Sequence, residues 1–255
     1  MDIPKNGVFF FDSGIGGLTV LAQCRKRIPQ EIFYYYGDNE HAPYGNLSEN
    51  VVRSLVLDVF KQTEYLQPQA AVLACNTATA VCVDTLRRKY TFPIVGAEPA
   101  VVSAAKQGGT VFVLTTRATY ESNRFQNLCR KTAEAYPSSC LVLHPCDSLA
   151  GEIEKNIFSK TWDVTPFLPT GNPDAVVLGC THYIYVKQQI AQFYNAKVYD
   201  GNTGMANRLQ SLILKTTQNI PKTECNDSCF FDNIFFLGKC KWSNKHVYEQ
   251  MFGIK

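Results

Sequence analysis

Residues 70–77 read AAVLACNT, and residues 175–182 read AVVLGCTH. Each stretch is a short apolar run that reaches a cysteine and continues with small polar residues. Apolar runs of this length are typical of strands buried in a parallel sheet. The two stretches therefore predict two similar strands, each with a thiol at its carboxyl end, in a chain built from two matched halves.

Strand-like runs alternate with helix-like segments along the chain, which favours an α/β fold with parallel sheets. In each half a polar loop follows the first strand, at Asp12 or Thr116, and the cysteine follows at nearly the same distance. Any α/β protein repeats such units at similar intervals, so the paired cysteine stretches carry the argument for duplication. The expected strands are residues 8–11, 32–36, 70–74, 94–97, 110–114, 140–143, 175–179 and 197–199.

We expect two similar α/β domains related by a pseudo-two-fold axis, each with a parallel-type sheet flanked by helices. The first domain comprises residues 1–98 plus 205–255 and carries Cys75; the second comprises residues 99–204 and carries Cys180. Parallel sheets bind ligands beyond the carboxyl ends of their strands, so the active site is expected in the cleft between the domains. The C-terminal part is expected to return to the first domain as a helix over 200–216, a strand over 230–237 and a helix over 245–252.

The bulk composition excludes several classes of protein. The chain has 255 residues and a net charge of +3, with no dense block of lysine and arginine, so no nucleic-acid partner is expected. No apolar run approaches the roughly 18 residues of a membrane span, and the N-terminus lacks a signal-peptide pattern. We therefore expect a cytoplasmic protein with no membrane partner.

The ten cysteines do not form a disulfide framework or a zinc motif in the sequence. No C-x-x-C occurs, and the chain lacks the spacing of small stapled domains. Cys225, Cys229 and Cys240 come nearest to a metal cluster, but no histidine lies close by, so no metal is expected. Most cysteines are expected to be reduced and buried.

The two cysteine stretches could carry chemistry. A thiol just before a helix N-terminus feels the positive end of the helix dipole, which is expected to lower the thiol pKa. The following residues, Asn76-Thr77 and Thr181-His182, offer backbone N–H groups and small polar side chains that suit a carboxylate. A single cysteine of this kind is usually a packing residue, whereas two matched stretches favour function.

Three reactions could use these thiols. A cysteine nucleophile with His182 as its base is conceivable, but it leaves Cys75 without a role. A redox pair is a second possibility. The third is proton transfer at a carbon, because inversion of a stereocentre needs an acid and a base on opposite faces, and two identical groups in different protonation states serve both directions.

A set of short motifs resembles the glutamate racemases, which belong to the cofactor-independent amino-acid racemases. The motifs occur in order over about the first 200 residues, and the last 50 residues match only loosely. They are FDSGIGGL at 11–18, YGD at 36–38, PYG at 43–45, ACNTA at 74–78, PIVG at 93–96, RAT at 117–119 and LGCTH at 178–182.

The resemblance implies specific roles. Cys75 would remove the α-proton of D-glutamate with help from Asp12, and Cys180 that of L-glutamate with help from His182. A glutamate near the second thiol would be Glu154, with Glu152 as its rival. The residues that would hold the substrate are Asp12, Ser13, Tyr44, Gly45, Asn76, Thr77, Thr116, Thr119, Thr181 and His182. The resemblance also implies a homodimer without a cofactor that supplies D-glutamate for peptidoglycan.

Other functions remain open at this point. An aspartate racemase would share the architecture and differ in the pocket for the side-chain carboxylate. A dinucleotide-binding module is suggested by Gly14-x-Gly16-Gly17 after the first strand, but Thr19 occupies the third glycine position of that fingerprint. A non-catalytic relative should have lost a thiol or its polar neighbours, and this chain keeps both.

Overall fold

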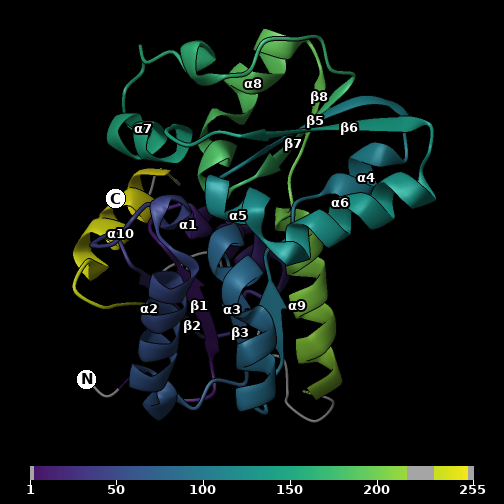
Figure 1. Cartoon of the computed structure of the whole chain (residues 1–255). Coiled ribbons are helices and arrows are strands. Elements are labelled where there is room, and N and C mark those ends of the chain that lie inside the picture. The colour runs from purple at the N-terminus through teal and green to yellow at the C-terminus, as the bar shows by residue number, and fades with distance from the viewer. Residues whose placement is uncertain (1–2, 217–232, 252–255) are drawn as a thin grey trace.

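The computed structural model describes residues 3–216 and 233–251. The chain forms two lobes, each built around one parallel sheet with helices on both faces (Figure 1). We call the lobe with Cys75 the first half and the lobe with Cys180 the second half. The expected α/β fold with two parallel sheets flanked by helices is thereby confirmed. We propose domain boundaries at residues 1–98 plus 205–255, and 99–204.

The first sheet has the strand order β4-β3-β1-β2-β9, and all its pairs are parallel. Its strands are β1 (Val8–Asp12), β2 (Phe33–Gly37), β3 (Ala70–Leu73), β4 (Ile94–Gly96) and β9 (Ile234–Leu237). The expected strand over 230–237 corresponds to β9, although residues 230–232 lie outside the described residues. The C-terminal segment thus returns to the first half as expected.

The second sheet has the order β6-β5-β7-β8 and is also parallel. Its strands are β5 (Gly109–Thr115), β6 (Ser139–Pro145), β7 (Ala175–Gly179) and β8 (Lys197–Tyr199). If each half is numbered from its own first strand, both sheets have the order 2-1-3-4, with β9 added at one edge of the first. This shared order supports the internal duplication inferred from the cysteine stretches.

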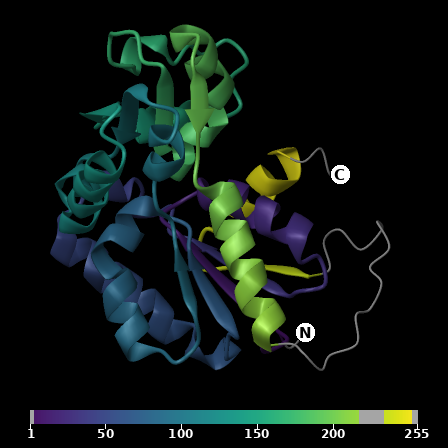
Figure 2. The same ribbon diagram turned by 90° about the vertical axis from the view of Figure 1, so that its right-hand side faces the viewer.

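Helices cover both faces of each sheet, and the side chains of β1 show why. Val8 and Phe10 pack into one core and Phe9 and Phe11 into the other, because successive residues of a strand point to opposite faces. Helices α1, α9 and α10 cover the first of these faces, and α2 and α3 cover the second. Figure 2 shows α9 running along the first half after the chain leaves β8. The bounds in the first half are α1 (Gly17–Arg27), α2 (Glu49–Gln62), α3 (Asn76–Lys89), α9 (Asn202–Thr216) and α10 (Lys241–Met251), with short 3-10 helices η1 (Tyr44–Asn46) and η2 (Glu64–Leu66).

In the second half, α4 and α6 pack on one face of the sheet, and α7, α8 and the 3-10 helix η4 pack on the other. The bounds in the second half are α4 (Val101–Ala105), α5 (Arg117–Glu121), α6 (Asn123–Ala135), α7 (Leu149–Asn156), η3 (Thr165–Phe167), η4 (Thr181–Val186) and α8 (Lys187–Tyr194).

The last helix of the first half, α10, begins at Lys241, four residues before the expected start, and residue 252 lies outside the described residues.

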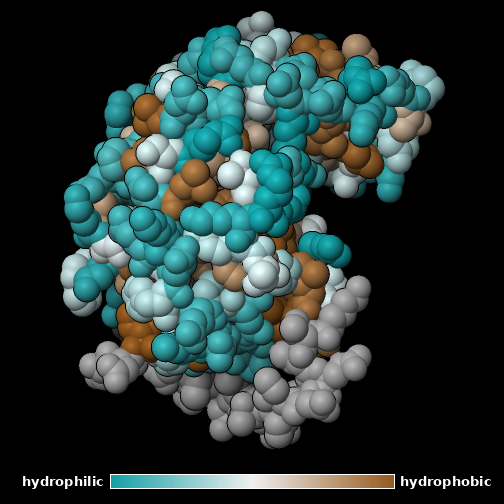
Figure 3. All heavy atoms as spheres, turned by 60° about the horizontal axis from the view of Figure 1, so that its bottom comes forward, coloured by the Kyte–Doolittle hydropathy of each residue, from teal (hydrophilic) through white to brown (hydrophobic). Residues whose placement is uncertain are grey.

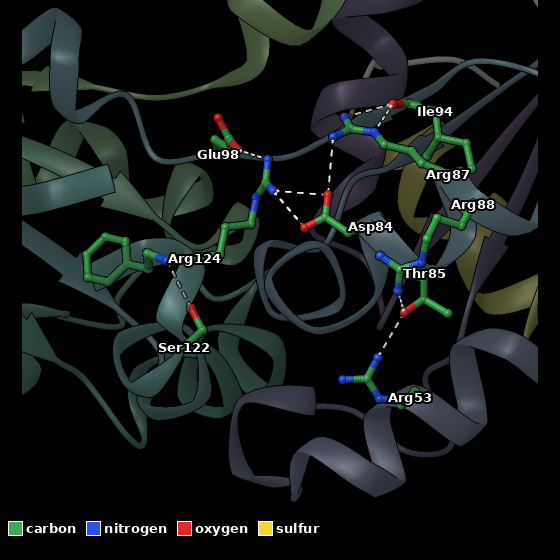
Figure 4. A network of polar contacts seen from close by, with 10 residues as sticks. Arg53, Asp84, Thr85, Arg87, Arg88, Ile94, Glu98, Ser122 and Arg124 are labelled. Carbon is green, nitrogen blue, oxygen red and sulfur yellow. Dashed lines mark hydrogen bonds and ion pairs between the residues drawn. The ribbon is translucent and has the colours of Figure 1, made fainter. Parts of the chain in front are cut away.

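An ion-pair cluster joins the two halves beside the linker between β4 and α4 (Figure 4). Arg124 of α6 contacts Asp84 of α3, with nitrogen–oxygen distances of 3.3 and 3.4 Å, and also contacts Glu98 in the linker. Arg87 approaches Asp84 from the other side and donates to the carbonyl of Ile94. The cluster ties α6 of the second half to α3 of the first.

The surface is mixed, with hydrophobic residues scattered among hydrophilic ones, and it is hollowed at one side (Figure 3). A groove of about 1020 Å³ at the junction of the halves is lined by residues that include Arg87, Tyr199 and Arg208, and neither Cys75 nor Cys180 lines it. Within 3–216 and 233–251, no helix combines the length and hydropathy that a membrane crossing requires.

Candidate active site

Asp12 is the last residue of β1 and is fully buried. Its Oδ1 accepts the N–H of Gly14 at 2.9 Å, so the carboxylate is held by the loop that follows the strand. Burial raises the pKa of Asp12, and nearby His182 and the N–H groups of Gly14 and Gly17 oppose that rise.

Cys75 follows β3 and is the N-cap residue of α3. Its Sγ accepts the N–H of Ala78 at 3.4 Å and also hydrogen-bonds with the side chain of Ser13. Burial and the charge of Asp12 nevertheless raise the pKa of Cys75 to about 12. The N–H of Ala78 at the helix N-terminus acts to lower this pKa, but the expected net lowering is wrong because burial and Asp12 outweigh that N–H group. Cys75 is a thiol at neutral pH.

Cys180 follows β7, the equivalent strand of the second half, but its surroundings differ. This cysteine was expected to stand just before a helix N-terminus; instead the chain forms the 3-10 helix η4, and α8 begins only at Lys187. The sulfur makes no cap contact, and it lies 3.8 Å from Nδ1 of His182. The first thiol is thus held by the N–H of Ala78 and the side chain of Ser13, and the second by an imidazole.

His182 links Cys180 to a carboxylate. Its Nε2 lies 3.2 Å from Oε2 of Glu154 on α7, whereas Glu152 on the same helix pairs with Lys155 at 2.8 Å. Glu154, not its rival, therefore reaches the thiol's histidine. Burial acts to lower the pKa of His182, but its contacts with Cys180 and Glu154 and the charge of Asp12 outweigh burial and raise this pKa well above its ordinary value.

Threonines from both halves meet beside the thiols. Oγ1 of Thr77 lies 3.0 Å from Oγ1 of Thr116 and 3.4 Å from that of Thr119. Thr116 also caps α5 by accepting the N–H of Thr119. On the other side, the hydroxyl of Thr181 donates to Oδ2 of Asp12 at 3.4 Å. In each case the loop after the third strand of one half therefore contacts the loop after the first strand of the other.

Glycines in the first half allow this close approach. A Cβ on Gly16 would lie 2.9 Å from both N and Nδ1 of His182, and closer still to Oγ1 of Thr181. A Cβ on Gly45 would lie 2.6 Å from Cβ of Thr116. Both glycines therefore lie against loops of the second half.

The remaining predicted residues lie around Cys75. Tyr44 is fully buried, and its hydroxyl donates to Oδ2 of Asp38 at 2.7 Å. Asn76, the first residue of α3, is also buried. Asp38 and Asn39 were not among the expected site residues, yet Asn39 donates from Nδ2 to Oε1 of Glu154 at 3.2 Å. Their position directly after β2, at the carboxyl edge of the sheet, is the signal that could have found them.

The site is closed but polar. Cys75 and Cys180 are 6% and 8% exposed, and their neighbours include the carboxylate, imidazole and hydroxyl groups described above. Cys180 is one of the groups near enough to Cys75 to contribute to its raised pKa. Among the described residues, no group of three or more histidine, cysteine or acidic residues could hold a metal ion. Cys225 and Cys229 lie outside those residues.

Comparison with known proteins gives one consistent result. The family described as "Asp/Glu/Hydantoin racemase" matches residues 19–209. The glutamate racemases of Clostridium acetobutylicum and Clostridium perfringens are each 36% identical over 220 residues, which cover 82% of this chain and 85% and 84% of theirs.

Solved structures agree with the sequence matches. A structure of Escherichia coli glutamate racemase in complex with L-glutamate and the activator UDP-MurNAc-ala has a TM-score of 0.78 at 26% identity, over 98% of this chain and 96% of that one. Isoform RacE1 of glutamate racemase from Bacillus anthracis has a TM-score of 0.75 at 26% identity, over 98% and 95%. The chain therefore belongs to the Asp/Glu/hydantoin racemase family and is an amino-acid racemase.

Proposed function

We propose that the chain is a glutamate racemase that interconverts L- and D-glutamate by two-base proton transfer at the α-carbon, without a cofactor. One observation carries the proposal: Cys75 and Cys180 follow equivalent strands of two sheets with the same strand order, and the loop of each cysteine contacts the polar loop after the first strand of the other half. A pair of matched thiols suits a reaction whose two directions are mirror images.

The proton transfers balance in each direction. In the L-to-D direction the Cys180 thiolate takes the α-proton of L-glutamate, and the electron pair of the broken C–H bond delocalises into the α-carboxylate. The Cys75 thiol then donates its proton to the opposite face, which leaves D-glutamate, a Cys180 thiol and a Cys75 thiolate. The D-to-L direction reverses these steps.

The electrostatics support a division of labour between the thiols. The pKa of Cys75, raised to about 12, makes this residue the proton donor of the resting enzyme. A protonated imidazole stabilises a thiolate beside it, and His182 contacts Cys180 and has a raised pKa. Asp12 would assist Cys75 by taking up or returning its proton, since its own pKa is raised.

The same loops supply groups that suit an amino-acid substrate. Hydroxyls, backbone N–H groups and an amide surround the thiols, and such groups bind carboxylates without a metal. We assign substrate binding to Asp12, Ser13, Tyr44, Gly45, Asn76, Thr77, Thr116, Thr119, Thr181 and His182.

The proposed role in the cell is the supply of D-glutamate for peptidoglycan by a cytoplasmic homodimer, with no nucleic-acid or membrane partner. The E. coli relative, whose bound activator is UDP-MurNAc-ala, supports a link to the cell wall.

The test is exchange of the α-hydrogen with solvent. Purified protein without added cofactor is expected to wash deuterium from D₂O into both enantiomers of glutamate and to racemise them, with aspartate run in parallel. Cys75→Ala and Cys180→Ala should each abolish racemisation while keeping the fold, as judged by circular dichroism. Racemisation by either variant at the parent rate contradicts the two-base assignment, and faster turnover of aspartate points to an aspartate racemase.

A further inference from the structure

Asn39 stands at the outer end of a chain of polar contacts that leads to the second thiol. Its Nδ2 donates to Oε1 of Glu154 at 3.2 Å. The other oxygen of Glu154 lies 3.2 Å from Nε2 of His182, whose Nδ1 lies 3.8 Å from Sγ of Cys180. Each member of the chain therefore contacts the next, and of the three side chains before Cys180 only that of His182 contacts its sulfur.

The chain of contacts crosses between the halves. Glu154, His182 and Cys180 belong to the second half, whereas Asn39 follows β2 of the first. The half that carries Cys75 thus supplies the outermost group on the Cys180 side. Gly14, also of the first half, packs against the same two side chains, because a Cβ there would lie 3.2 Å from Oε1 of Glu154 and 3.5 Å from Nε2 of His182.

Asn39 is itself held in place by neighbouring contacts. The backbone N–H groups of Asn39 and Glu40 hydrogen-bond with the thiol of Cys240, just before α10. The ion pair between Lys239 and Glu40, at 3.0 Å, is exposed and contributes little to holding the loop, so Glu40→Gln leaves the backbone contacts in place. The β9–α10 connection therefore fixes the loop from which Asn39 reaches Glu154.

We propose that Asn39 is a positioning residue for the Cys180 side of the reaction, which holds the Glu154 carboxylate against His182 across the junction of the halves. The proposal rests on the proposed function. An amide is suited to this task because it donates a hydrogen bond to the carboxylate without adding charge. With one carboxylate oxygen held by Asn39, the other faces the imidazole that contacts sulfur. Through this bond the first half contributes to the surroundings of the second thiol.

The proposal predicts a one-sided effect. The two enantiomers have equal free energies, so kcat/KM must remain equal in the two directions in any variant. Altering Asn39 should raise the free energy of the transition state for proton transfer at Cys180 and leave that at Cys75 unchanged. The primary isotope effect measured with α-deuterated L-glutamate should then increase, because Cys180 removes that deuteron. The effect measured with α-deuterated D-glutamate should decrease, because the step at Cys75 becomes less rate-limiting.

The experiment compares Asn39→Ala and Asn39→Asp with the parent and with the control Glu40→Gln. Asn39→Asp keeps the shape of the side chain but turns an anionic oxygen toward Glu154. We expect kcat/KM to fall by about 10- to 100-fold in Asn39→Ala and further in Asn39→Asp, as for a lost hydrogen bond to a charged group. The two isotope effects should diverge in both variants, while Glu40→Gln behaves as the parent.

Two outcomes overturn the proposal and leave the proposed function intact: a parent-like rate for Asn39→Asp, or isotope effects that change equally for both enantiomers. Equal changes would mean that Asn39 only supports the fold. A parent protein that does not racemise glutamate instead overturns the proposed function, and with it the role of Asn39.

Discussion

The contact between the halves at Gly16 can be tested with one methyl group. Gly16 precedes α1 with φ −58° and ψ −40°, a right-handed helical conformation that alanine adopts without strain. The added Cβ would nevertheless lie 2.9 Å from N and Nδ1 of His182. Gly16→Ala therefore changes packing against the second half without changing the local backbone preference.

The cost follows from the packing. Overpacking a tight contact costs about 1–3 kcal/mol. Because α1 and η4 belong to different halves, we expect the clash to be relieved by moving the His182 loop away from Asp12. If the whole cost is added to the free energy of the transition state, kcat/KM falls by about 5- to 150-fold. If the folded state absorbs it instead, the melting temperature falls by about 2–4 °C per kcal/mol.

The assay measures racemisation of both glutamate enantiomers and thermal unfolding for the parent, Gly16→Ala and Gly204→Ala. Gly204 is an exposed residue of α9 with no atom within 4 Å of its would-be Cβ, so alanine there should leave kcat/KM unchanged and slightly stabilise the helix. A Gly16→Ala enzyme with both parent kcat/KM and parent melting temperature would refute the close contact of the two loops.

Three further predictions concern the thiols, the histidine and the junction. At pH 8 iodoacetamide should modify exposed Cys140 well before Cys75, because a pKa of about 12 leaves only about one Cys75 in 10⁴ as thiolate, and peptide mapping that finds Cys75 modified first would contradict this. The pKa of His182 is raised in the folded state, so the stability that its protonation adds is complete below the unfolded pKa of about 6.5 and is lost as pH rises through the folded pKa. In urea unfolding, the difference in free energy of unfolding between the parent and His182→Gln should therefore shrink as pH rises. A difference that grows with pH would be inconsistent with this. Arg124→Ala should lower the melting temperature by about 2–4 °C in low salt and by less in 1 M salt, since its ion pairs are partly exposed. The control Arg130→Ala breaks an ion pair within α6 and should not change how readily the halves separate, as measured by hydrogen exchange.

The strands and both thiols could be predicted from local sequence. Apolar runs before Cys75 and Cys180 are strands because their residues are buried on both faces of a parallel sheet, and that pattern is visible in the chain. The pairing of the C-terminal strand β9 with β2 is also consistent with the expected return to the first half. The similar spacing from polar loop to cysteine in the two halves and their shared strand order both support the inferred duplication.

The properties that depend on contacts between distant residues could not be predicted. The pKa of Cys75 rises because burial outweighs the helix N–H groups, and the sequence does not show how deeply a thiol is buried. The 3-10 form of η4 and the contact between Asn39 and Glu154 arise where two halves pack together. Each half alone lacks one partner of such a contact, so no local pattern encodes it.

The central claim is that Cys75 and Cys180 act on opposite faces of one α-carbon. The most direct measurement is a crystal structure of the protein with bound glutamate. We predict that the two Sγ atoms lie on opposite sides of the α-carbon, each within about 3–4 Å of it, as proton transfer requires. A structure in which both sulfurs lie on one side, or in which either is separated from the ligand by packed side chains, would contradict the account.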